Sequence, residues 1–252
     1  MSFRLKMDRS AKRMGSRLIL ALDQPSNRPR HLLPQSMEVL EKVHPYICAV
    51  KINRQLVLPL GLLNGVRKVV NLAHDRGLPV IMDCKINDVG HTNRAIAESY
   101  YEAGFDALTA SPFVGWRGGL QPVFEVSKKM DRGVILLVYM SHEGAEEGYG
   151  QVVRDPKGDL RPQYALFAEK ALSWGADGAV VGATYPEKIK EIYGILGDHV
   201  PIYSPGVGAQ GGSVEAAVKA GAHYLIVGRA ITLAEEPAEA AKSLRDLARS
   251  VR

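Results

Sequence analysis

Three charged side chains stand at the end of an apolar run that is typical of a buried strand. The apolar run is 79–82, and Asp83, Lys85 and Asp88 follow it within the stretch IMDCKINDVGHTN, residues 81–93. Unpaired charge is costly in a buried strand, so we interpret the D-x-K-x-x-D spacing as functional rather than as a solvated charge run. Side chains alternate along a strand, which predicts that Asp83 and Lys85 point to one face and Cys84 to the other.

The carboxylates on both sides of Lys85 indicate which chemistry this lysine performs. A nucleophilic lysine needs a depressed pKa, whereas neighbouring carboxylates stabilise the ammonium form. We therefore interpret Lys85 as a cationic acid that stabilises and protonates a developing carbanion. That chemistry is typical of decarboxylation.

A second set of residues indicates an anionic ligand. Four glycines in SPGVGAQGG would let backbone amides approach an anion: Gly206, Gly208, Gly211 and Gly212. A helix expected from Ser213 would add the positive end of its dipole. Arg229 can donate charge-assisted hydrogen bonds to phosphate oxygens. Together these features predict a phosphorylated substrate.

The elements that must position these residues alternate between strand-like and helix-like segments, the pattern of a parallel sheet with crossover helices. The eight strand-like runs are 17–22, 46–51, 79–84, 106–110, 133–139, 178–181, 201–204 and 224–228. Eight such units in 252 residues predict a single-domain TIM (β/α)8 barrel over 1–252. A doubly wound open sheet would use fewer strands and a glycine-rich first turn.

Active sites of such barrels lie at the carboxyl ends of the strands, and polar residues of this chain gather at those ends. They are Asp23, Lys51, Asp83, Lys85, Ser141, the stretch SPGVGAQGG, Gly228 and Arg229. Two further segments are expected outside the regular units. Residues 1–16 should form a leading helical segment with a solvated basic face, and 140–163 a long active-site loop that serves as a lid.

Composition narrows the class of protein. The net charge is +5, with a pI near 9.1, but no aromatic-rich basic patch or RNA-binding signature accompanies it, which favours an anionic small molecule over nucleic acid. The two cysteines and scattered histidines lack metal-ligand spacing. No apolar run approaches the roughly 20 residues needed to span a bilayer. We expect a cytoplasmic protein without a membrane partner.

Six motifs, in this order and spacing, are similar to those of the orotidine 5'-phosphate decarboxylase family in its short archaeal form. They are LALD, VKIN, DCKINDVGHTN, MSHEGA, SPGVGAQGG and IVGRAI. The resemblance covers 17–252. It implies a homodimeric TIM barrel that converts orotidine 5'-phosphate to uridine 5'-phosphate in pyrimidine biosynthesis, with no metal or organic cofactor.

The resemblance also implies roles for individual residues. Lys85 would protonate the pyrimidine carbanion within a charge network that includes Asp83, Lys51 and Asp88. Asp88 and Thr92 would reach the site of the partner subunit. Ser141 would bond the pyrimidine, Gln210 would link base and phosphate, and Arg229 with the amides near Gly228 would hold the phosphate. The implied substrate-binding residues are Asp23, Lys51, Thr92, Ser141, Pro205, Gln210, Gly228 and Arg229.

Three alternatives remain open from the sequence. Magnesium-dependent 3-keto-gulonate 6-phosphate decarboxylases and hexulose-phosphate synthases share a D-x-K-x-x-D pattern, but they place an acidic metal ligand where this chain has Lys51. A phosphosugar or tryptophan-pathway isomerase would share the phosphate site without needing the charged triad. A non-catalytic anion-binding barrel would account for the basic pI and little else.

Overall fold

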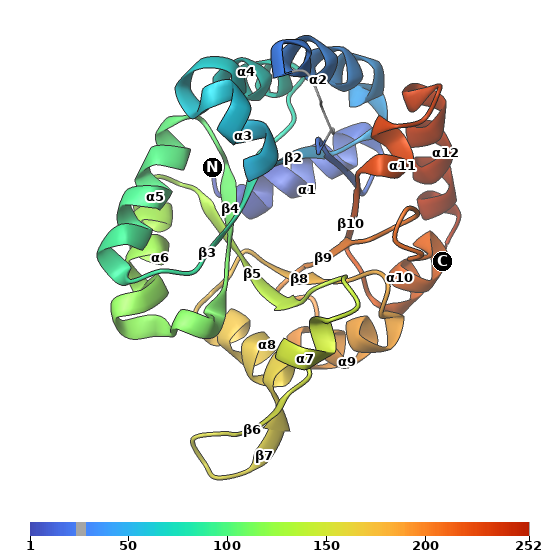
Figure 1. Cartoon of the computed structure of the whole chain (residues 1–252). Coiled ribbons are helices and arrows are strands. Elements are labelled where there is room, and N and C mark those ends of the chain that lie inside the picture. Colours follow the sequence, from blue (N-terminus) through green and yellow to red (C-terminus); the bar gives the residue numbers. More distant parts are fainter. Residues whose placement is uncertain (24–28, 252) are drawn as a thin grey trace.

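The strands form a closed barrel in the computed structural model of the chain, which describes residues 1–23 and 29–251. Eight parallel strands follow one another around the ring in the order β1-β10-β9-β8-β5-β4-β3-β2 (Figure 1). They are β1 (Leu18–Ala21), β2 (Ala49–Asn53), β3 (Val80–Ile86), β4 (Ala107–Ala110), β5 (Gly133–Tyr139), β8 (Gly178–Val181), β9 (Ile202–Pro205) and β10 (Tyr224–Val227). Every strand predicted from the sequence is present, and the TIM barrel is confirmed.

Helices surround the strands as an outer layer (Figure 1). The outer helices are α2 (Pro29–Val43), α3 (Arg54–Leu60), α4 (Arg67–Asp75), α5 (Gly90–Glu102), α6 (Gln121–Lys129), α8 (Gln163–Ser173), α9 (Pro186–Leu196), α10 (Val214–Ala220) and α12 (Pro237–Ser250). Their apolar residues recur at helical spacing, as in α4, where Val69, Val70 and Ala73 are buried and Lys68 is exposed. The helices therefore pack one face on the barrel and leave the other in solvent.

One apolar helical segment is longer than the roughly 20 residues that a bilayer-spanning helix needs. Residues Arg54–Asp75 are continuously helical for 22 residues with a mean hydropathy of 1.3 in their most apolar window, so by length and composition alone they qualify to cross a membrane. The expectation that no apolar run approaches this length is therefore wrong. Leu56, Val66 and Val69 of this run belong to the buried core of the barrel. The expected cytoplasmic location stays a prediction.

The leading segment forms helix α1 (Phe3–Met14), which lies across the amino-terminal end of the barrel (Figure 1). Phe3 and Met7 are buried in the same cluster as residues of the barrel interior. The basic side chains are not simply solvated, as the sequence analysis expected, because Lys6 Nζ donates to Asp106 Oδ1 at 2.7 Å and Arg13 donates to two backbone carbonyls. Helix α1 therefore closes one end of the barrel.

Two separate apolar clusters lie on the two sides of the barrel sheet. Cys48 belongs to the cluster inside the barrel, and Cys84 to the cluster between the strands and the outer helices. Both thiols are free and buried. The two cysteines therefore lie on opposite sides of the sheet, and each packs as a small core residue. Burial raises the pKa of both thiols, that of Cys84 to about 12.

The long connection 140–163 contains regular structure that the sequence analysis did not anticipate. It holds the short helix α7 (Ala145–Gly148) and an antiparallel hairpin of β6 (Val152–Arg154) and β7 (Leu160–Pro162). The hairpin projects outward from the ring of helices (Figure 1). Only Met140 and Ser141 of this connection line the central cavity. The lid role stays a prediction.

Candidate active site

A cavity of about 660 Å³ opens at the carboxyl ends of the barrel strands. Nearly all the predicted site residues line it: Asp23, Lys51, Asp83, Lys85, Ser141, Pro205, Gln210, Gly228 and Arg229. They come from strands or strand ends that are far apart in sequence and are brought together by closure of the barrel. Asp88 and Thr92 do not line this cavity.

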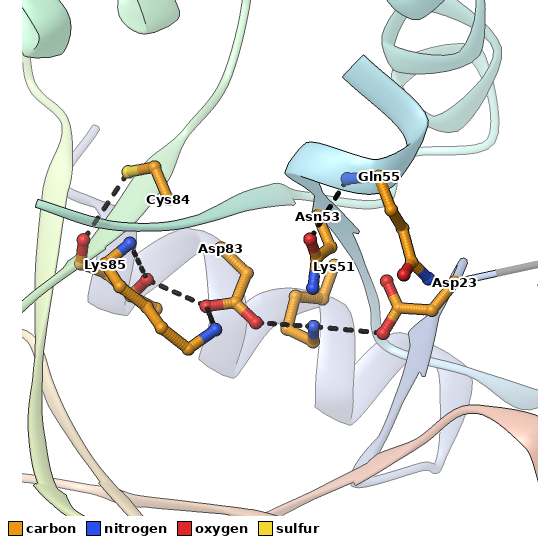
Figure 2. A network of polar contacts seen from close by, with 8 residues as sticks. Asp23, Lys51, Asn53, Gln55, Asp83, Cys84 and Lys85 are labelled. Carbon is orange, nitrogen blue, oxygen red and sulfur yellow. Dashed lines mark hydrogen bonds and ion pairs between the residues drawn. The ribbon is translucent and has the colours of Figure 1, made fainter. Parts of the chain in front are cut away.

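Four of these side chains form an array of alternating charge across the ends of β1, β2 and β3 (Figure 2). Lys51 Nζ donates to Asp83 Oδ2 at 2.7 Å and to Asp23 Oδ2 at 3.4 Å. Lys85 Nζ donates to the other oxygen of Asp83, Oδ1, at 2.6 Å. Each inner member of the array thus lies between two opposite charges, which is what a buried charge requires to stay ionised.

The two inner members keep their charges at neutral pH. Burial alone would lower the pKa of Lys51, but the carboxylates of Asp83 and Asp23 raise it above its usual value. Burial alone would raise the pKa of Asp83, yet the ammonium groups of Lys51 and Lys85 hold it well below its usual range. The array therefore presents fixed charges to whatever occupies the cavity.

The outer carboxylate of the array has an oxygen available for a ligand. Asp23 Oδ2 accepts from Lys51, whereas Asp23 Oδ1 is buried and has no hydrogen-bond partner within the described parts of the chain. Buried carboxylate oxygens are nearly always hydrogen-bonded. An unpaired one that faces a cavity is suited to a hydroxyl group of a bound molecule.

Sequence reasoning missed Thr109, which lies in β4 beside the array and lines the cavity. Its hydroxyl donates to Asp83 Oδ1 at 3.0 Å and accepts from the backbone N–H of Lys85 at 2.9 Å. The available signal was a hydroxyl residue near the end of the predicted strand 106–110. It was overlooked because threonine is common in strands for reasons of packing alone.

The glycine-rich loop after β9 differs from its expected arrangement. The N–H groups of Gly208, Gly211 and Gly212 donate to carbonyls within the same loop, so they are not directed at a ligand. Gly206 has a φ of 98°, and a Cβ there would lie 3.0 Å from Ser141 Cβ and 3.1 Å from Gln210 Oε1. Gly206 therefore brings these two polar side chains together at the rim of the cavity.

A different set of groups is available for a phosphate. Arg229 begins the short helix α11 (Arg229–Thr232) and is exposed at the cavity wall. The backbone N–H groups of Arg229 and Ala230, in its first turn, donate to no backbone carbonyl of the described residues. Gly228 and Arg229 both line the cavity, and their role in binding an anion stays a prediction.

Asp88 lies in the turn that follows β3, and Thr92 lies half-buried in the first turn of α5. Asp88 is exposed, and its Oδ1 accepts from the N–H of Val89 at 2.7 Å. The buried side chain of Asn93 holds this turn, because it bonds the N–H of Asp88 at 3.0 Å and its carbonyl at 2.6 Å. Asp88 is thus carried on a turn braced by Asn93, and it does not line its own cavity.

The chain is similar to a family of known enzymes. The family model described as "Orotidine 5'-phosphate decarboxylase / HUMPS family" matches residues 16–244. The orotidine 5'-phosphate decarboxylase of Methanosarcina mazei is 38% identical over 224 residues, which are 89% of this chain and 91% of that protein.

Solved structures agree with this assignment. Orotidine 5'-monophosphate decarboxylase from Methanocaldococcus jannaschii, complexed with inhibitor BMP, is similar with a TM-score of 0.77 and 31% identity over 92% of this chain and 98% of that one. Leishmania donovani UMP synthase gives a TM-score of 0.86 and 29% identity, and this chain, although wholly covered, spans only 56% of its length. The matched family model and these relatives lead to one conclusion: the chain belongs to the orotidine 5'-phosphate decarboxylase / HUMPS family.

Proposed function

We propose that this chain converts orotidine 5'-phosphate to uridine 5'-phosphate by decarboxylation. The observation that carries the proposal is the alternating array of Asp23, Lys51, Asp83 and Lys85 in a cavity whose wall also bears Arg229. Such a reaction needs one cation where the carbanion forms and another for the phosphate. The names of the curated relatives support the same reaction.

In the proposed step, the bond between the pyrimidine ring and its carboxylate carbon breaks. Carbon dioxide leaves, and the electron pair stays on the ring carbon. The ammonium group of Lys85 stabilises this pair and then donates a proton to it, after which the lysine takes a proton from solvent. The ion pair of 2.6 Å with Asp83 supports this role, because it fixes the position of the Lys85 ammonium group in the cavity.

The surroundings of the array strengthen its effect on the reaction. The same cavity is lined by the apolar side chains of Ile81, Ile135 and Val180. Fixed charges act more strongly in surroundings of low dielectric constant than in water, and they need no reorganisation as the carbanion develops. The apolar wall also suits the release of carbon dioxide, a molecule without charge.

The remaining residues of the cavity would bind the other parts of the nucleotide. We assign the unpaired Asp23 Oδ1 to a ribose hydroxyl, Ser141 to the pyrimidine, and Gln210 to a position between the pyrimidine and the phosphate. Arg229 and the first amides of α11 would hold the phosphate. This division supports one extended substrate that spans the cavity from the charged array to α11.

A homodimer would complete the site. Asp88 is an exposed carboxylate on a braced turn, it is absent from its own cavity, and Val89 beside it is 53% exposed. Two-fold symmetric dimers are the commonest oligomers, and each subunit then offers the same surface to the other. We propose that Asp88 and Thr92 of each subunit reach the partner's cavity and extend its charge network beyond Lys85.

The family description joins the decarboxylases to a second group, so a magnesium-dependent sugar-phosphate enzyme needs a separate test. The end of β2 carries Lys51, which is 6% exposed and would repel a cation. The test follows the absorbance of orotidine 5'-phosphate with and without excess chelator, and the proposal expects the same rate in both. No turnover of orotidine 5'-phosphate in either condition would contradict the proposal. It would leave the rival, which acts on a different sugar phosphate, and the non-catalytic anion-binding barrel.

A further inference from the structure

The contact between Thr109 and the charged array has a structural cause in the pairing of β3 with β4. Met82 pairs with Leu108 and Ile86 pairs with Ala110, so the three residues 83–85 of β3 lie opposite the single residue Thr109. The two strands are therefore out of step at the position that bears the predicted acid. Such bulges re-aim side chains next to active sites.

The backbone of Lys85 takes up the extra length. Its φ is 49°, which lies in the left-handed region, and in the described parts of the chain only Asp131 among other non-glycine residues has a positive φ. A left-handed conformation is unfavourable for a residue with a Cβ and persists only where its surroundings enforce it. A neighbouring group must therefore hold Lys85 in this conformation.

The hydroxyl of Thr109 meets both parts of the Asp83–Lys85 pair. Its oxygen accepts from the backbone N–H of Lys85 at 2.9 Å, and its proton is donated to Asp83 Oδ1 at 3.0 Å. The same Asp83 oxygen accepts from Lys85 Nζ at 2.6 Å. One hydroxyl thus joins the main chain of Lys85 to the carboxylate that receives its side chain.

We propose that Thr109 is a positioning residue that sets the direction of the Lys85 ammonium group. The inference rests on the proposed function, because only there does Lys85 act as the proton donor. Thr109 is 3% exposed, and its branched Cβ restricts the rotation of the hydroxyl. The hydroxyl is therefore held where both hydrogen bonds form, and without it the left-handed backbone at Lys85 loses its partner.

The test compares Thr109→Val, which keeps the shape and loses both hydrogen bonds, with Thr109→Ser, which keeps the hydroxyl. We expect Thr109→Val to lower kcat about 10- to 100-fold, as small misplacements of catalytic groups do, with little change in KM. Thr109→Ser should recover most of kcat. Thr232→Val is the matched control, since its buried Oγ1 has no hydrogen-bond partner in the described part of the chain.

A second measurement does not depend on turnover. Amide hydrogen exchange at Lys85 should be about 10-fold faster in Thr109→Val than in the wild type or in Thr232→Val, because its N–H has lost its acceptor. If the wild type decarboxylates orotidine 5'-phosphate and Thr109→Val matches it in kcat and in exchange, the inference fails while the proposed function stands. If the serine variant loses as much kcat as the valine variant, a positioning role for the hydroxyl is also excluded. A wild type without turnover contradicts the proposed function itself.

Discussion

Lys51 Nζ lies 2.7 Å from Asp83 Oδ2, and both of these opposite charges are buried, at 6% and 8% exposure. The pair contacts two further charges, Asp23 and Lys85, so that each member is bonded on both sides. Placing charges in a barrel interior costs stability unless they are paired. Their arrangement at the base of the cavity is therefore best explained by the chemistry that it serves.

Breaking this pair should affect both stability and the pH dependence of the enzyme. Lys51→Met leaves Asp83 with Lys85 alone, and we expect the free energy of unfolding to fall by about 3 kcal/mol. The pKa of Asp83 should rise, so that kcat falls as the pH is lowered towards 5, a range in which the wild-type carboxylate stays ionised. Urea unfolding and pH–rate profiles measure the two effects.

Lys68→Met, at an exposed position of α4, is the control for that experiment. It should alter neither the unfolding curve nor the pH profile. If the free energy of unfolding of Lys51→Met equals that of the wild type, the prediction is wrong, because the fold would then not need Lys51 to compensate the buried charge of Asp83.

The phosphate role of Arg229 predicts a selective loss of affinity. Arg229→Ala removes a charge-assisted contact, which corresponds to an increase in KM of about 10- to 100-fold for orotidine 5'-phosphate. Orotidine, which lacks the phosphate, should be turned over equally slowly by the variant and the wild type. Arg9→Ala, on α1 at the other end of the barrel, serves as the control. An equal loss with both substrates would mean that Arg229 acts elsewhere than on the phosphate.

Subunit exchange tests whether Asp88 serves the partner. Lys85→Ala and Asp88→Ala chains should each be nearly inactive alone. A purified heterodimer of the two should recover about half of the wild-type activity, because one of its two sites combines an intact Lys85 with an intact Asp88. The pairing of Lys85→Ala with Lys51→Met should show no activity beyond that of Lys51→Met alone, since both residues belong to one chain's site. A heterodimer of the first kind without activity would place Asp88 in its own subunit.

The amino-terminal end of the barrel offers a prediction about acid stability. Asp106 accepts hydrogen bonds from His74, Lys6 and Arg132. Burial alone would raise the pKa of Asp106, but the hydrogen bonds from His74, Lys6 and the backbone N–H of Val80 lower it to about 2 from its usual 3.8. A lowered pKa in the folded state stabilises the fold above pH 3.8, and this contribution is lost as the pH falls through about 2.

Asp106→Asn should therefore lower the free energy of unfolding by about 2 kcal/mol at pH 7, and most of the difference from wild type should be lost by pH 2. Thermal or urea unfolding at pH 7, 4 and 2 measures it. Asp75→Asn, an exposed neighbour on α4, should show no such difference. A difference for Asp106→Asn that stays constant across this range would show that its charge plays no part.

Sequence patterns predicted the barrel and most of the cavity because both depend on local periodicity. Apolar runs located all eight strands, and strand ends located Asp23, Lys51, Asp83 and Ser141 correctly. The side-chain alternation that placed Asp83 and Lys85 on one face gave the right result, but it assumed a regular strand. The left-handed residue at the bulge could not be foreseen, because it depends on how β3 pairs with β4.

Other features depend on contacts between distant segments. The glycine loop was expected to direct its amides at the anion, yet Gly208, Gly211 and Gly212 use theirs to hold the loop together. The basic face of helix α1 was expected to be solvated, but Lys6 forms an ion pair with Asp106, which lies 100 residues further along the chain. Nothing in the local pattern of charge encodes these pairings.

The central claim is that Lys85 protonates the carbanion left by decarboxylation, and Lys85→Ala tests it most directly. A general acid contributes about 10²- to 10⁴-fold to a rate, and loss of the fixed charge adds to that. The measurement compares kcat with orotidine 5'-phosphate and the affinity for uridine 5'-phosphate in this variant, the wild type and Lys129→Ala, an exposed control on α6. We predict that Lys85→Ala loses at least about 10³-fold in kcat and keeps most of its affinity for uridine 5'-phosphate. A Lys85→Ala enzyme with wild-type turnover would contradict the account.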